Sequence, residues 1–352
     1  MGKNIVIFSD GTGQKGGVNA NTNIYKIFNM IEDRTARQIA YYDPGLGTDM
    51  EGLAGLIGGK GFSKNILDCY RFIFENYQAG DHIYLFGFSR GAATVRSLSG
   101  FLDLFGVLPI SRPDIIPDAF EIYKILDHEK RKAQAEAFVK KHHTMWCRIK
   151  FLGVFDTVAA LGLPNKFLSA LLEKFFPHRF HSFELCRNVD FARHALSIDE
   201  ERKTFSPTLW DKLKGEHHAP DRMKQVWFCG VHTDVGGGYN EEELSNISLK
   251  WMVREAEEKG LLFYKPSDPA KNRYLQLFSS PEDIEGMMHN ELLGINRRIF
   301  KRAVRSWNEA THGEICLHES VLSRRNNPAN ENNPKYSPWA LKISRTIEPK
   351  QS

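Results

Sequence analysis

Cysteine is scarce in this sequence of 352 residues, and its spacing fits neither a disulfide framework nor a zinc site. No two cysteines form a C-x-x-C pair, and their number is odd. A sparse set of this kind is typical of buried thiols in a reducing compartment. The five residues are Cys69, Cys147, Cys186, Cys229 and Cys316.

Long hydrophobic runs are also missing. After MGKN the apolar run covers only Ile5–Phe8, which is too short for the hydrophobic region of a signal peptide. No segment reaches the length of a transmembrane helix. We therefore expect the chain to be cytoplasmic where it is made, and export that needs no cleavable signal stays open.

The sequence has no strong excess of charge of either sign. It contains 47 Lys and Arg against 43 Asp and Glu, a formal net charge of +4, and no long block of basic residues. A nucleic-acid partner is therefore not expected. The apolar fraction of 41% is ordinary for a globular protein, and composition leaves the oligomeric state open.

Six short apolar runs are present, and each ends in a polar or glycine-rich turn, as buried parallel strands do. Between them lie helical patterns at Asn23–Glu32, Ser63–Tyr77 and Ala92–Phe105. This alternation predicts an α/β fold with a mostly parallel sheet, helices on both faces and ligands at the carboxyl ends of the strands. The runs are Ile5–Ser9, Gln38–Tyr42, His82–Phe88, Ile149–Phe155, Ala195–Ile198 and Gln225–Val231.

The domain organisation predicted from these patterns is a core over residues 1–262 and a helical or irregular extension over 263–352 packed on that core. Within the core, Pro164–Leu185 is rich in Phe and Leu and has few carboxylates. It is interpreted either as a lid over an apolar cleft or as an insertion that packs in the core.

The stretch GFSRG places Ser89 between Gly87 and Gly91, after a strand pattern and before a helix pattern. This context favours a nucleophile elbow, in which a sharp turn exposes the serine. The alternative is a serine that merely caps an ordinary helix. In the elbow, the amide of Arg90 at the helix N-terminus would be one oxyanion donor.

A hydrolase with such an elbow takes its acid and then its histidine further along the chain. His232 directly follows a strand and opens the glycine-rich loop HTDVGGGY, so we expect it to be the base. Asp156 ends the strand IKFLGVF and is the preferred acid, with Asp199 after ALSI as the alternative. Asp234 is expected to shape the loop of His232.

The turn SDGTG after the first strand offers backbone amides for the second oxyanion donor, with Gly11 and Thr12 as the candidates. The alternative for this stretch is a simple β-turn. A metallohydrolase built from Asp10, Asp156, Asp234 and His232 is also conceivable, because all four follow predicted strands and carboxylates suit hard metal ions.

Six motifs in order resemble the DUF2235 family, which includes the Tle1-type phospholipase effectors of type VI secretion. They are DGT, YYDPGLGT, GFSRGA, GVFDTV, ARHALSIDE and GVHTDVGGGY, within Lys3 to Leu262. The resemblance implies an α/β-hydrolase-like fold, a triad of Ser89, Asp156 and His232, and hydrolysis of ester bonds in lipids, phospholipids among them. The secreted effectors usually carry large extra domains, so an effector and a housekeeping esterase are equally compatible.

The function predicted from the sequence is a serine esterase or lipase that needs no metal and no cofactor and acts on a small-molecule or lipid ester. Contact with a membrane surface stays open. The alternatives are a metal-dependent phosphodiesterase or phosphatase, and a non-catalytic module that binds a lipid or a partner on a hydrolase scaffold.

Overall fold

The computed structural model describes residues 2–11, 16–17, 20–45, 60–158, 184–213, 219, 221–280, 284–294, 296–327 and 335–349. Two sequence predictions fall outside them. One is Thr12, and the other is the segment Pro164–Leu185 except for its last two residues.

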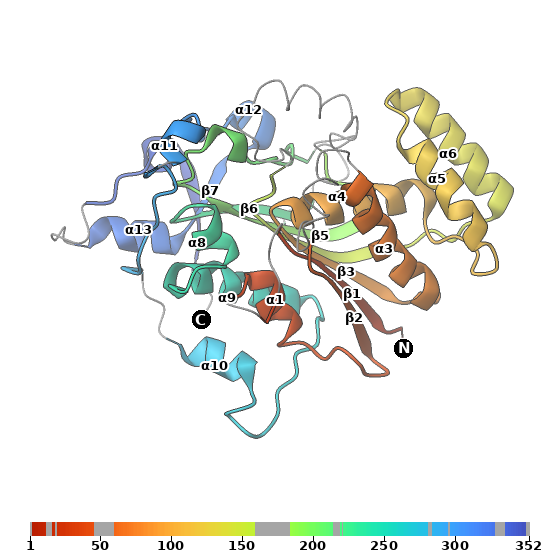
Figure 1. Ribbon diagram of the computed structural model, residues 1–352, viewed down its shortest axis with the longest axis horizontal. Coiled ribbons are helices and arrows are strands. Elements are labelled where there is room, and N and C mark those ends of the chain that lie inside the picture. Colours follow the sequence, from red (N-terminus) through yellow and green to blue (C-terminus); the bar gives the residue numbers. More distant parts are fainter. Residues whose placement is uncertain are drawn as a thin grey trace.

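The described residues form one sheet of eight strands in the order β2-β1-β3-β4-β5-β6-β7-β8, and every neighbouring pair is parallel (Figure 1). The predicted α/β fold with a parallel sheet is confirmed, and β1 to β6 overlap the six apolar runs. The strands are β1 (Asn4–Ser9), β2 (Gln38–Asp43), β3 (His82–Phe88), β4 (Ile149–Phe155), β5 (Val189–Ser197), β6 (Met223–Phe228), β7 (Ile315–His318) and β8 (Arg345–Glu348).

Both faces of the sheet are apolar, which explains why the central strands are unbroken apolar runs. In β3, Ile83 and Leu85 lie in one hydrophobic cluster, while Tyr84 and Phe86 lie in the other. All four side chains are buried. Successive side chains of a strand point to opposite faces, so a strand covered on both sides needs apolar residues at every position.

Helices cover the two faces (Figure 1). The first cluster contains residues of α3 (Lys60–Asn76), α4 (Arg90–Phe105), α5 (Ile116–Tyr123) and α6 (His128–His142). The second contains residues of α1 (Asn23–Phe28), α9 (Glu243–Glu258) and α10 (Arg273–Ser279). The shorter elements are α8 (His232–Gly236), α11 (Asn296–Ile299), α12 (Glu309–His312), α13 (Glu319–Asn326), and the 3-10 turns η1 (Pro113–Ile115), η2 (Lys203–Phe205) and η4 (Trp339–Lys342).

The segment after residue 262 contributes β7 and β8 to the sheet, which the sequence analysis did not predict. Each has only four residues, ICLH and RTIE, too short for a clear apolar period. A third cluster joins Trp227 of β6 to Leu317 of β7, Val321 of α13 and Ala340 of η4. The extension is therefore bound to the edge of the sheet through β6.

No helix among the described residues combines the length and the apolar character needed to cross a membrane.

Candidate active site

Ser89 stands at a strained turn between β3 and α4. Its φ of 56° and ψ of −118° lie in a region that residues other than glycine rarely adopt. A methyl group on Gly87 would come within 2.6 Å of the Ala92 backbone, and one on Gly91 within 2.0 Å of the Ser9 carbonyl oxygen. The two glycines of GFSRG therefore allow the strand, the turn and the helix to meet.

The Ser89 side chain does not act as an ordinary helix cap. A capping serine has extended backbone angles and accepts a hydrogen bond from an amide two or three residues on. Ser89 occupies the N-cap position of α4, but its backbone is not extended and its hydroxyl accepts no capping bond from this helix. The hydroxyl is not used to stabilise the described helix.

Asp156 follows β4, the strand next to β3. Phe88 and Phe155 are register partners, so Ser89 and Asp156 leave neighbouring strands at the same edge of the sheet. The Ser89 amide donates to the Phe155 carbonyl oxygen at 3.1 Å. Asp156 is fully buried and has a positive φ of 36°, a second strained backbone position at this edge.

His232 is the first residue of α8 and lies close to both turns. Its Nδ1 is 2.6 Å from Asp156 Oδ2. Its ring packs on Phe88, the residue before Ser89, with 4.6 Å between centroids, and on Phe205 at 5.1 Å. A carboxylate bond at Nδ1 leaves Nε2 as the nitrogen for proton exchange with a substrate or a hydroxyl.

The Asp156 carboxylate is surrounded by donors. Arg305 Nη1 and Nη2 donate to Oδ1 and Oδ2 at 2.6 and 2.8 Å, and Ser197 donates to Oδ1 through its amide at 3.0 Å. Burial alone raises the pKa of Asp156, but the charge and hydrogen bonds of Arg305 and the bond with His232 bring it well below its usual range. The carboxylate is therefore ionised at neutral pH.

Arg305 is the site residue that sequence reasoning missed. It stands in the stretch NRRIFKRAVRSW, where nothing local distinguishes it from the other basic residues. Its partner Asp156 is 149 residues away in sequence. A hydrolase triad alone does not predict a cation behind the acid, so no motif indicated it.

Asp199, the alternative acid, has different partners. Its Oδ2 accepts from the Gly230 amide at 2.7 Å and from the Tyr336 hydroxyl at 2.8 Å. Burial raises the pKa of Asp199 to about 6. Asp199 thus ties the turns after β5 and β6 to each other, while the carboxylate bonded to His232 is that of Asp156.

The backbone amides expected to hold an oxyanion differ from one another in their hydrogen-bond partners. Gly11 lies beside the Ser89 turn, since a Cβ built on it would be 3.6 Å from Ser89 Cβ, but its amide donates to Asp10 Oδ1 at 2.7 Å. The Gly11 amide therefore donates to a neighbouring carboxylate in this structure. Arg90 begins α4, where backbone amides have no partner within the helix. Thr12 lies outside the described residues.

The carboxylates of the metallohydrolase alternative each have other partners. Asp10 accepts from the Thr22 and Tyr42 hydroxyls, and burial raises its pKa to about 6. Asp234 bonds to His289. Over the described part of the chain, no three His, Cys, Asp or Glu side chains are grouped so that they could hold a metal ion.

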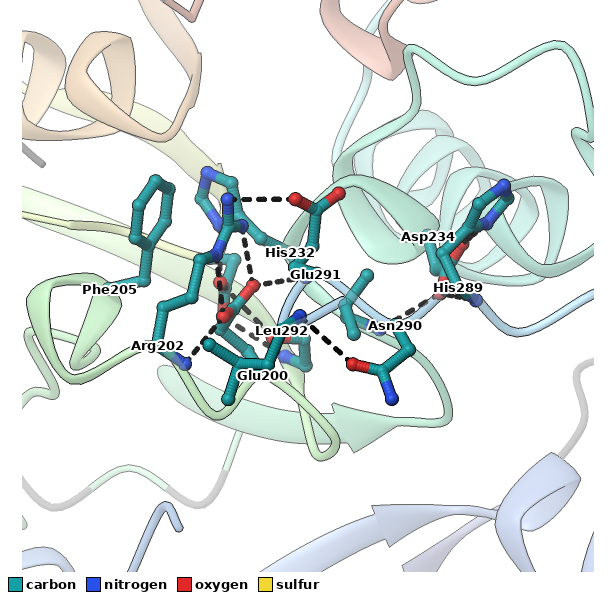
Figure 2. A network of polar contacts seen from close by, with 12 residues as sticks. Glu200, Arg202, Phe205, His232, Asp234, His289, Asn290, Glu291 and Leu292 are labelled. Atoms are coloured by element: carbon teal, nitrogen blue, oxygen red, sulfur yellow. Dashed lines mark hydrogen bonds and ion pairs between the residues drawn. The ribbon is translucent and has the colours of Figure 1, made fainter. Parts of the chain in front are cut away.

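A network of ion pairs contacts the backbone of His232 and the Phe205 ring beside it (Figure 2). The His232 amide donates to Glu200 Oε2 at 3.3 Å, and Glu200 is paired with Arg202 at 2.7 Å. Arg202 also donates to Glu291 at 3.1 Å, and its guanidinium carbon is 3.7 Å from the centroid of the Phe205 ring. Both the backbone of the histidine and the ring beside it are thereby held in place.

Asp234 shapes the loop of His232, as the sequence predicts. Its Oδ2 accepts from the Val231 amide at 3.0 Å, and its Oδ1 is 2.7 Å from His289 Nδ1 (Figure 2). The role of His289 was not predicted. Through these bonds residues 284–294 hold the start of α8.

A parallel sheet covered by helices on both faces, with a strained serine turn and a His–Asp pair at its carboxyl edge, defines an α/β-hydrolase-like protein. Residues 3–255 match the family model described as T6SS, phospholipase effector Tle1-like, catalytic domain. The chain belongs to this family, and the resemblance seen in the six motifs is confirmed.

The chain is also similar to a curated protein of Saccharomyces cerevisiae that is described as uncharacterized. The two are 29% identical over 258 residues, which is 66% of this chain and 36% of that protein. The chain thus spans about a third of the length of this curated relative.

Two solved structures are similar to the chain. One is the crystal structure of an uncharacterized protein from Pseudomonas aeruginosa, with a TM-score of 0.49, 18% identity and coverage of 80% of this chain and 49% of that chain. The other is the Tle1 effector bound to the VgrG spike of the Type 6 secretion system, with a TM-score of 0.45, 15% identity and coverage of 85% and 78%.

Proposed function

We propose that the protein is a serine hydrolase that cleaves carboxylic ester bonds of lipids, phospholipids among them, through an acyl-enzyme intermediate. The observation that carries the proposal is the His232–Asp156 bond at the same sheet edge as the strained Ser89. A triad is recognised by geometry and chain order, and the order serine, acid, histidine is that of α/β-hydrolases.

In this mechanism, Ser89 attacks the acyl carbon while His232 Nε2 takes its proton and later gives it to the leaving alcohol. Asp156 fixes the tautomer of His232 through Nδ1 and stabilises the imidazolium. Water then hydrolyses the acyl-enzyme by the same proton route.

The oxyanion is held by backbone amides in this proposal. The Arg90 amide at the start of α4 points from a helix N-terminus, where negative charge is stabilised. The second donor stays one of the two sequence candidates, Gly11 or Thr12, and the Gly11 amide donates to Asp10 Oδ1 at 2.7 Å.

A surface beside the site supports a lipid substrate. Residues 293–294 and 296–304, here called the basic rim, expose Leu293, Ile299 and Val304 by 65, 40 and 54%. The rim carries four basic residues, and no acidic residue occurs between Glu291 and Glu309. It lies against the turn that carries Phe205, since the Lys203 amide donates to the Lys301 carbonyl oxygen at 2.8 Å. Apolar and basic side chains together suit the surface of an anionic membrane.

The test of the function is labelling with a fluorophosphonate probe, together with hydrolysis of a p-nitrophenyl ester and of phospholipid vesicles. We expect labelling of the wild type and at least about a 10³-fold loss of rate in Ser89→Ala. Activity that EDTA abolishes and Ser89→Ala leaves intact would favour the metal-dependent alternative. A folded protein that hydrolyses no ester would favour the binding module.

A further inference from the structure

We propose that Arg305 is a positioning residue for the triad acid, holding the Asp156 carboxylate ionised and turned so that Oδ2 faces His232. The inference rests on the proposed serine hydrolase function. It assigns part of the site to a residue outside the matched catalytic domain, which ends at residue 255.

The geometry between the two side chains is that of a bidentate pair. Nη1 donates to Oδ1 at 2.6 Å and Nη2 donates to Oδ2 at 2.8 Å. Two parallel bonds from a planar guanidinium fix the plane of a carboxylate, which one point charge does not. Oδ2 is also the oxygen that lies 2.6 Å from His232 Nδ1, so Arg305 sets the direction in which the acid meets the base.

The guanidinium is itself fixed by neutral acceptors. Nη1 donates to the Ser197 carbonyl oxygen and hydroxyl, both at 2.7 Å, and Nη2 donates to the Phe205 carbonyl oxygen at 2.7 Å. Phe205 in turn packs on His232. Arg305 is 6% exposed and Asp156 is fully buried, so water contributes little to either charge. The cation therefore links the acid, the end of β5 and the ring beside the base.

The charge on Arg305 stabilises the buried Asp156 carboxylate, which without a cation would hold a proton to higher pH. Removing Arg305 should therefore favour protonation of Asp156.

Among the described residues, three other titratable or charged side chains face the Asp156 carboxylate. They are His232, Arg305 and His194. His194 lies on β5, where burial lowers its pKa to about 3, and its Nε2 accepts from the Thr157 amide at 3.1 Å. It is neutral over the assay range. A shift of the acid limb in an Arg305 variant thus reports on the Asp156 carboxylate that is bonded to His232.

The experiment compares Arg305→Met with Arg112→Met in the full chain of 352 residues. Arg112 also bonds a carboxylate twice, that of Asp114 at 2.9 and 2.7 Å, but both side chains are exposed and lie outside the site and the basic rim. For a soluble p-nitrophenyl ester we expect Arg305→Met to lower kcat about 10²-fold, with KM within about threefold, because the base is misdirected. The acid limb of the pH profile should move to higher pH. Arg112→Met should change neither quantity by more than about twofold.

A conservative variant and a double mutant separate positioning from folding. Arg305→Lys keeps the charge but loses the bidentate geometry, so we expect a kcat about tenfold above that of Arg305→Met and an acid limb near that of the wild type. In a protein that already carries Asp156→Asn, adding Arg305→Met should lower kcat by less than a further factor of about two. Both substitutions disable the same Asp156–Arg305 pair. Circular dichroism and thermal unfolding verify folding, and Arg305→Lys carries the test if Arg305→Met does not fold.

The inference is wrong if either Arg305 variant folds and keeps the kcat and the acid limb of the wild type. It is also wrong if Arg305→Met lowers kcat as much in the Asp156→Asn protein as it does in the wild type. If the wild type is labelled by fluorophosphonate and Ser89→Ala is inactive, such a result removes only the role of Arg305. An unlabelled wild type and an active Ser89→Ala remove the proposed function itself.

Discussion

Two aspartates that follow neighbouring strands, Asp156 after β4 and Asp199 after β5, have opposite proton affinities. The pKa of Asp156 is held well below its usual range, while that of Asp199 is raised to about 6 by burial. The difference lies in their partners: Asp156 bonds a guanidinium in two places, whereas Asp199 accepts from an amide and a hydroxyl. An acid that must stay charged beside a histidine has the first environment and not the second.

The two aspartates give a matched pair of variants for the proposed triad acid. Asp156→Asn should reduce kcat by about 10³–10⁴-fold, because an amide neither fixes the tautomer of His232 nor stabilises its cation. Asp199→Asn should stay within about threefold of the wild type. Ester hydrolysis with both purified proteins checks this, and the opposite ranking would make Asp199 the acid.

Asp199 also predicts how stability depends on pH. In the unfolded chain its carboxyl loses its proton near pH 4, but in the folded protein only near its pKa of about 6. Its contribution to stability is therefore full below pH 4, falls as pH rises towards 6 and stays low above. Asp199→Asn removes this loss of stability at higher pH. The amide oxygen of the new asparagine can still accept both hydrogen bonds.

Chemical denaturation at pH 4 and pH 7.5 measures the effect. We expect the variant to match the wild type at pH 4 and to exceed its free energy of unfolding by about 1–2 kcal/mol at pH 7.5. A variant that is less stable at the higher pH would show that the charge of Asp199 is stabilising.

At the scale of elements, the close contact between β1 and α4 positions Ser89, the proposed nucleophile. Gly91→Ala would place a methyl group 2.0 Å from the Ser9 carbonyl oxygen, a backbone atom that cannot move away without shifting the strand. We expect a loss of about 3 kcal/mol or more in unfolding free energy, or no folded protein. The control is Gly100→Ala on the same helix, whose nearest neighbour is the Tyr123 hydroxyl at 3.2 Å.

Gly100→Ala should stay within about 1 kcal/mol of the wild type, because alanine favours the helix while the tyrosine gives way slightly. Thermal unfolding of both variants decides the comparison. Equal destabilisation would mean that α4 as a whole, and not its junction with β1, limits the fold.

The basic rim gives a second prediction at this scale. Arg297→Glu with Arg298→Glu should weaken sedimentation with anionic phosphatidylglycerol vesicles at least about tenfold, since each basic residue near such a surface contributes about 1 kcal/mol. The control carries the same change of charge on the exposed Lys132 and Lys140 of α6. If both pairs weaken binding equally, net charge rather than the rim drives the association.

Across the whole molecule, the sequence predicted the parallel sheet and the turns at its carboxyl edge, because buried strands leave unbroken apolar runs. It could not determine strand order, and the choice between Asp156 and Asp199 depended on which turn reaches His232. The strands β7 and β8 and the role of Arg305 were not foreseen, because four-residue strands have no readable period and a single arginine has no local signal. Arg305 and Asp156 are 149 positions apart in the sequence, so only the folded structure shows that they pair.

A truncation tests whether the chain folds without the segment after residue 262. Ending the chain after Leu262 removes β7 and β8 and uncovers the third hydrophobic cluster on β6, including the fully buried Trp227. An exposed apolar edge promotes aggregation, so we expect this variant to be insoluble or to elute as aggregates in size-exclusion chromatography. A soluble, fluorophosphonate-labelled fragment would instead show that residues 2–262 fold and act alone.

The counter-ion of Asp156 has a consequence for the time at which activity appears. During synthesis, Ser89, Asp156 and His232 leave the ribosome well before Arg305, and domains generally begin to fold from their N-terminal part. A nascent chain that already holds the three proposed triad residues still lacks the cation that orients the acid. We therefore expect a ribosome-bound chain to acquire the proposed hydrolase activity late, only once the segment after residue 262 has emerged and joined the sheet.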